Sequence, residues 1–199
     1  MGGGRAVSRW LSVEPRLCCG NGCRHTEQVS SRPFPSPTIP ISDERDVLLD
    51  YLDFFRDLAV GKVSGMTPQD QARARLPSGW TPLELLNHLR HIERRWLEWG
   101  FAGRQLADPW ADQRDDRWHT DDELATLIAR LGQQAEVTRQ VVRSHGLDDI
   151  GQPGERWDGA PPPPLRRVLL HLLQEYARHV GHLDIVRELT DGSVGEEGV

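Results

Sequence analysis

The hydrophobic residues of this chain recur with the period of an α-helix over four separate segments. Apolar side chains return every three or four positions in residues 43–61, 82–100, 121–145 and 165–191, and no stretch alternates apolar and polar residues as a half-buried strand would. A period of 3.6 residues places the apolar side chains on one face of each helix. The pattern therefore predicts an all-α protein, a four-helix bundle with long connections.

Local signals mark where the helices begin and end. Ser42 is expected to cap the first helix, which should stop at Gly61. Capping boxes, in which a threonine and the glutamate three residues later bond to each other's backbone N–H, are predicted at Thr81–Glu84 and Thr120–Glu123. Gly192 is typical of the residue that ends a helix. The connection MTPQDQARARLP is expected to hold a further short helix.

The chain is expected to contain one domain, the bundle of residues 41–192, followed by a tail of residues 193–199. Residues 1–40 are rich in Gly, Ser, Pro and Arg and show no hydrophobic period. Such a segment buries too little apolar surface to offset its ordering entropy, so we predict a flexible extension without a catalytic role. Its cysteines match no zinc spacing and are interpreted as an incidental cluster, Cys18, Cys19 and Cys23.

Charge and composition exclude several classes of function. A net charge of -6 argues against a nucleic-acid-binding surface and a basic membrane patch. No apolar run reaches the roughly 18 residues that a membrane helix needs. The N-terminus lacks an apolar stretch of signal-peptide length, so we expect a cytoplasmic protein. A bundle surface is compatible with a homodimer.

Three residues form a candidate metal site. His88 lies at the edge of the apolar face of the second helix, and a Glu-x-x-x-His pair, Glu175 and His179, lies on that of the fourth helix. Residues four apart share one helix face, so a histidine from a facing helix would complete two imidazoles and one carboxylate. Three protein ligands leave a coordination position open for catalysis. The alternatives are a hydrogen-bonded core histidine and an ordinary contact within one helix.

Several neighbours of these residues carry possible roles. His182 is expected to serve as a general base or substrate anchor, and His171 to orient a ligand. His91 falls nearer the polar side of its helix and is the weaker candidate for a ligand. Trp96 and Tyr176 are predicted to line the cofactor pocket.

The two helices that carry the candidate ligands resemble the DinB-like superfamily, and look closest to one of its actinobacterial branches. The second helix contains an HL-x-x-x-E-x-x-W core, and the fourth an E-x-A-R-H-x-G-H-x-D core, which is the more specific of the two. The resemblance covers roughly residues 42–192 and is carried by His88, Leu89, Glu93, Trp96, Glu175, Ala177, Arg178, His179, Gly181, His182 and Asp184.

The resemblance implies a bundle that binds a divalent cation, zinc or nickel in most members, through three residues. Many members carry three histidines, but this chain has Glu175 at one of those positions, and is similar there to the mycothiol-dependent maleylpyruvate isomerase branch. The implied metal ligands are His88, Glu175 and His179. The superfamily includes enzymes that use low-molecular-weight thiols such as mycothiol or bacillithiol.

We therefore expect a metal-dependent transferase or isomerase that joins such a thiol to a small electrophile. A hydrolase that uses the same ligands with water is the first alternative. The other is a non-catalytic stress-response or interaction bundle with a structural metal, which would normally have four protein ligands. Coordination of the metal by His182 or His91 would favour the non-catalytic alternative.

Overall fold

The computed structural model describes residues 32–40 and 43–194, and these form a helical bundle. The long helices are α1 (Glu44–Ser64), α3 (Pro82–Glu93), which continues as the π-helix η1 (Arg94–Phe101), α4 (Leu124–Ser144) and α5 (Leu165–Asp191). The minor elements are α2 (Pro68–Gln71), the 3-10 helix η2 (Glu155–Trp157) and an antiparallel hairpin of β1 (Gln113–Arg114) and β2 (Arg117–Trp118). The prediction of an all-α four-helix bundle is confirmed; the hairpin was not predicted.

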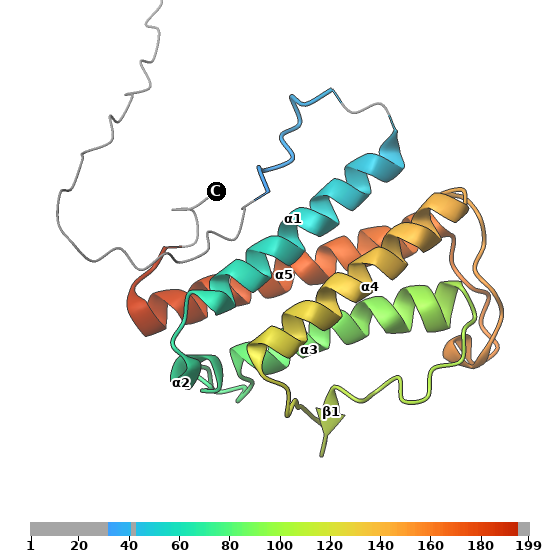
Figure 1. The fold of residues 1–199 in the computed structure, drawn as a ribbon. Coiled ribbons are helices and arrows are strands. Elements are labelled where there is room, and N and C mark those ends of the chain that lie inside the picture. The colour runs from blue at the N-terminus through green and yellow to red at the C-terminus, as the bar shows by residue number, and fades with distance from the viewer. Residues whose placement is uncertain (1–31, 41–42, 195–199) are drawn as a thin grey trace, which may run out of the picture.

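The direction of the helices determines where their connections run. α1 and α5 lie side by side and point the same way, whereas α3 and α4 point the opposite way (Figure 1). Because α3 and α4 are parallel, the chain between them must return along the bundle. This connection, residues 102–123, is called the crossover segment below; it contains the hairpin and lies over α3.

The predicted helix boundaries are mostly confirmed. Thr81 and Glu84 form the capping box at the start of α3, and Gly192, with a φ of 76°, ends α5. The second predicted capping box is wrong, because α4 is preceded by Glu123 without a side-chain cap. The Thr120 hydroxyl instead accepts a hydrogen bond from the backbone N–H two residues later.

The first helix differs from its prediction at both ends. Asp43 caps it, and its side chain accepts a hydrogen bond from the backbone N–H of Arg45, whereas Ser42 lies outside the described residues. The helix also continues through Gly61 to Ser64, because a glycine inside a helix lowers its stability by only about 1 kcal/mol and tertiary packing offsets that loss. The short helix α2 confirms the one expected in this connection.

A π-helix changes which side chains of the second long helix reach the core. The N–H of Ala102 bonds to the carbonyl five residues earlier, at Leu97, which is the π-helical spacing. A wider turn shifts the apolar face, so Leu97 and Phe101 are buried while Trp96 and Trp99 are only half-buried. A regular helical wheel cannot reproduce this shift.

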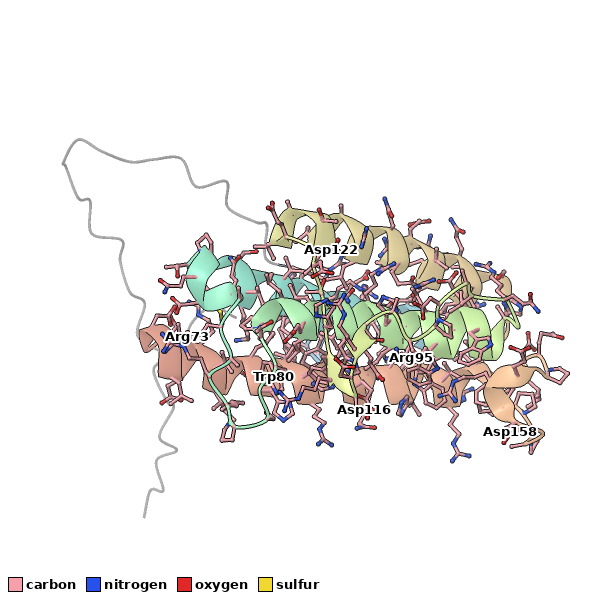
Figure 2. All side chains as sticks on the ribbon, turned by 90° about the horizontal axis from the view of Figure 1, so that it is seen from below. Arg73, Trp80, Arg95, Asp116, Asp122 and Asp158 are labelled. Atoms are coloured by element: carbon pink, nitrogen blue, oxygen red, sulfur yellow. The ribbon has the colours of Figure 1, made fainter. Side chains whose placement is uncertain are left out.

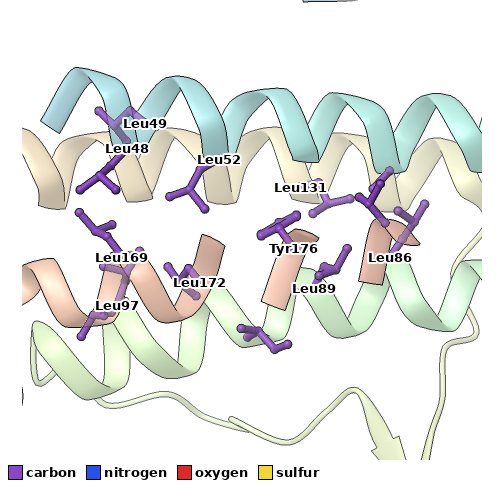
Figure 3. Packing of buried hydrophobic residues seen from close by; sticks show 14 of the residues in the cluster. Leu48, Leu49, Leu52, Leu86, Leu89, Leu97, Leu131, Leu169, Leu172 and Tyr176 are labelled. Carbon is purple, nitrogen blue, oxygen red and sulfur yellow. The ribbon is translucent and has the colours of Figure 1, made fainter. Parts of the chain in front are cut away.

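Leucine side chains from all four long helices fill the centre of the bundle (Figure 3). Each such side chain contributes about 1.5–3 kcal/mol when removed from water. The labelled members of this core are Leu48, Leu49, Leu52, Leu86, Leu89, Leu97, Leu131, Leu169, Leu172 and Tyr176.

One fully buried carboxylate lies inside this apolar core. Glu93 of α3 accepts hydrogen bonds from the guanidinium of Arg56 (3.1 Å), from the hydroxyl of Thr138 and from the hydroxyl of Tyr176. Arg56 also pairs with Asp53 on its own helix. The donors come from α1, α4 and α5, so the carboxylate connects α3 with each of the other three long helices.

Part of the predicted N-terminal extension contacts the bundle. The ring of Phe34 packs edge-on against Tyr51 and Phe54, with centroid distances of 6.1 and 5.3 Å. Arg32 pairs with Asp57 at 3.2 Å. Residues 1–31, with the three cysteines, lie outside the described residues, so their predicted flexibility stays a prediction. Among the described residues, none of the helices combines the length and the apolar character needed to cross a membrane.

Replacing Glu93 by glutamine is expected to lower the free energy of unfolding by about 3 kcal/mol, because Arg56 would lose its main counter-charge in a buried site. Urea denaturation followed by circular dichroism measures the change. Glu136→Gln is the matched control, since its carboxylate pairs with Arg139 at the surface and contributes less than about 1 kcal/mol. An equal effect of both substitutions would contradict the stabilising role of Glu93.

Candidate metal centre

The structure brings the three predicted ligands together. His88 projects from α3, and Glu175 and His179 from successive turns of α5. One ligand atom from each residue lies within 4.8 Å of the other two. Within the part of the chain that the structure describes, this is the group with the composition and spacing to hold a metal ion.

The donor set fits a divalent transition metal. Nε2 of His179 lies 3.4 Å from a carboxylate oxygen of Glu175. Two atoms bound about 2.1 Å from one tetrahedral ion are separated by about 3.4 Å, so this pair needs little rearrangement. Two imidazoles and one carboxylate suit zinc, nickel, iron or manganese.

The environment keeps the ligand histidine of α5 neutral. Burial, and then repulsion from His88, His182 and Arg178, lowers the pKa of His179 to about 3. A neutral imidazole has a free nitrogen lone pair, which is the form that a metal binds. Glu175 is more open, with 20% of its side chain exposed, so the site is reached from solvent on that side.

A buried aspartate of the crossover segment orients the other histidine. Nδ1 of His88 lies 2.9 Å from Oδ2 of Asp112, whose side chain is fully buried. An Asp···H–Nδ1 bond leaves Nε2 of the imidazole as the free acceptor for a metal. Arg95 holds the same carboxylate through two hydrogen bonds of 2.6 and 3.1 Å. Burial raises the pKa of Asp112, but the bonds from His88 and Arg95 outweigh it and lower the pKa to about 2.

The crossover segment is attached to α3 at further points. The side-chain amide of Asn87 donates to the carbonyl of His119 at 3.0 Å. The ring of Trp118 stacks on that of His88, with centroids 3.9 Å apart and planes inclined by 22°. The stacked indole and the aspartate together restrict the rotation of the His88 ring.

The crossover segment also explains why one sequence interpretation was wrong. His91, expected nearer the polar side, is 2% exposed because this segment covers it. Its Nδ1 lies 4.0 Å from Asp112, and its Nε2 is 3.0 Å from a guanidinium nitrogen of Arg90. Burial lowers the pKa of His91 to about 4. Neither His91 nor His182 belongs to the group of described residues whose donor atoms converge.

The other histidines of α5 flank the candidate ligands. Nδ1 of His182 lies 3.4 Å from Nδ1 of His179, so one ring donates to the other. Nε2 of His171 lies 3.6 Å from the carboxylate of Glu175. Both histidines therefore contact a ligand, as expected from the sequence, while a role of His182 in catalysis stays a prediction.

The two residues predicted to bind a cofactor are placed very differently. The ring of Trp96 lies 4.3 Å from that of His171, and the guanidinium of Arg156 covers it at 4.6 Å. Trp96 therefore contacts His171, which in turn contacts the candidate ligand Glu175. Tyr176 is completely buried and donates its hydroxyl to Glu93, so its position favours a role in the core over contact with a cofactor.

Sequence reasoning did not find Asp112, Arg95 or Trp118. Asp112 lies in an acidic, tryptophan-rich stretch without helical period, DPWADQRDDRWH, and is separated from His88 by 24 positions. No local spacing relates the two residues. The one available signal was that a long connection between parallel helices has to pass over the bundle face that carries the ligands.

The fold and the site together define a DinB-like bundle with a candidate His/Glu/His metal site. The family model of mycothiol-S-transferases matches residues 47–192, which is most of the chain, and the chain belongs to that family. The match confirms the prediction of a thiol-dependent transferase. No curated protein matches the chain.

Glu175→Ala is expected to remove the bound metal, because two imidazoles without the anionic ligand hold a dication weakly. Elemental analysis of protein purified without chelator should give about one divalent ion per chain for the wild type and much less for the variant. Glu188→Ala, an exposed glutamate on the same helix, is the control and should retain the metal. Equal metal content in all three proteins would exclude this ligand set.

Asp112→Asn is expected to weaken zinc binding about 10–100-fold, because the amide no longer fixes the tautomer and orientation of His88. Competition with a chromophoric chelator measures the dissociation constant. Asp148→Asn changes a carboxylate that is 88% exposed and should leave the affinity unchanged. An unaltered affinity in Asp112→Asn would show that the aspartate does not support the metal site.

Proposed function

We propose that this protein is a metal-dependent enzyme that transfers mycothiol to a small electrophilic molecule, with zinc or nickel held by His88, Glu175 and His179. The observation that carries this proposal is the convergence of the three donors within 4.8 Å in a member of the mycothiol-S-transferase family. A bound dication lowers the pKa of a coordinated thiol, so that a thiolate is available at neutral pH.

The charges of the ligands suit that chemistry. One carboxylate offsets half of the charge of a dication, and the two neutral imidazoles add none. The remaining positive charge favours an anionic sulfur over a neutral one. Asp112 is neutralised by Arg95, so it orients His88 without adding net negative charge to the site.

The transfer needs one proton acceptor. The thiol loses its proton, the sulfur forms a bond to the electrophilic carbon, and the leaving group departs with the electron pair of the broken bond. His182 is proposed to take this proton, because its ring lies next to that of His179. Trp96 contacts His171, which lies next to Glu175, and we propose that Trp96 lines the part of the site where the electrophile binds. The cytoplasmic location and a homodimer remain part of the proposal.

Metal-loaded wild-type protein is expected to consume mycothiol in the presence of a chromogenic electrophile such as 1-chloro-2,4-dinitrobenzene. Chelator treatment and Glu175→Ala should each reduce the rate at least 100-fold, and reloading with zinc or nickel should restore only the wild type. The conjugate is measured by absorbance. Metal-dependent release of chloride without thiol consumption would instead identify a hydrolase.

A further inference from the structure

A cavity of about 400 Å³ lies beside the candidate metal centre and is not formed by its ligands. It is lined by the β1–β2 hairpin, the start of α3 and the loop before it, and it is open to solvent. The lining residues are Ser78, Gly79, Trp80, Glu84, Arg114, Asp115, Asp116, Arg117, Trp118 and His119. Figure 2 shows the hairpin, with Asp116 at its turn, crossing in front of the bundle, and Trp80 to one side of it.

The indole of Trp118 separates the cavity from the metal ligands, and the indole of Trp80 lies beside it. The indole of Trp118 stacks on His88 and lies 5.3 Å from the ring of His179. The indole of Trp80 lies 6.1 Å from that of Trp118 and 6.2 Å from the ring of His182. A molecule bound in the cavity is therefore separated from the metal ligands only by the indole ring of Trp118.

The shape of the hairpin holds Trp118 in this position. Its turn residues Asp115 and Asp116 have φ values of 52° and 59°, the left-handed conformation of the two-residue turns that match the twist of a hairpin. The backbone N–H of His119 donates to the carbonyl of Asp112 at 2.8 Å. The residue that orients His88 is thus also connected to the hairpin that forms the cavity wall.

The lining favours a neutral, hydroxyl-rich ring as the ligand. Indole faces accept the apolar C–H surface of a saturated ring, and charged side chains at the rim bind its hydroxyl groups. The rim carries the two cations Arg114 and Arg117 and three carboxylates, of which Asp115 and Asp116 are exposed, so neither sign dominates. Within residues 32–40 and 43–194, the side chain of Arg117 has no hydrogen-bond or ion-pair partner, and its guanidinium is available to a ligand.

We propose that this cavity binds the hydroxylated ring portion of the thiol cosubstrate and directs the sulfur past Trp118 to His88, Glu175 and His179. The inference rests on the proposed function, which requires a thiol with such a portion; mycothiol, a sugar-linked thiol, has one. The metal centre then acts on the sulfur, and the cavity determines which thiol is used.

The test compares mycothiol with N-acetylcysteine, a thiol without the hydroxylated rings, in metal-loaded protein. Trp80→Ala and Arg117→Ala are each expected to lower the ratio of kcat/KM for mycothiol to kcat/KM for N-acetylcysteine at least tenfold, mainly through KM for mycothiol. Metal content should stay at the wild-type level. Trp80→Phe, which keeps an aromatic face, should retain most of the preference.

Arg73→Ala is the control, because Arg73 is exposed in the same region and does not line the cavity. Arg117 is exposed as well, so its removal tests the cavity even where Trp80→Ala fails to fold. An unchanged ratio in Arg117→Ala and in folded Trp80→Ala, with an active wild type, would overturn the cavity proposal alone. A wild type that uses neither thiol would overturn the proposed function and the cavity proposal with it.

Discussion

The hydrogen bonds around the Glu93 carboxylate are the interaction on which the rest of the structure depends. A carboxylate without partners in an apolar core would be strongly destabilising, so the donors Arg56, Thr138 and Tyr176 must reach it when the bundle forms. These donors belong to three different helices. Leucine side chains can pack at several offsets of one helix along another. The Glu93 carboxylate, however, receives all its hydrogen bonds at only one of these offsets.

That offset also places the metal ligands. α3 and α5 run in opposite directions, so residues that precede Glu93 on α3 face residues that follow Tyr176 on α5. His88 precedes Glu93 by five positions and therefore faces His179, and the two rings lie 5.3 Å apart. Glu175 adjoins Tyr176 in the chain and points from the core toward the open side of the site. The buried network and the metal centre are thus two consequences of one helix register.

The bundle and the crossover segment contribute different parts of the site. The helices supply the three donors, whose spacing follows from helical geometry. The crossover segment supplies Asp112, which orients His88, and the hairpin, which carries Trp118. A loop held by a rigid scaffold can change its lining residues without disturbing the donors. Members of such a family can therefore keep the metal chemistry while they differ in the molecules that they accept.

The sequence by itself determined the features that depend on neighbours along the chain. Helical periodicity, the Thr81–Glu84 capping box and the pairing of Glu175 with His179 all follow from residues within a few positions of one another. The apolar face of the second helix also singled out His88, and the resemblance implied that all three residues are metal ligands. The tertiary structure decided the bond between His88 and Asp112, and the burial of His91 under the crossover segment. These features depend on contacts between residues far apart in the chain, which no local period encodes. The π-helix also depends on the tertiary structure. Packing in the core buries Leu97 and Phe101, which a regular helix would present on a different face.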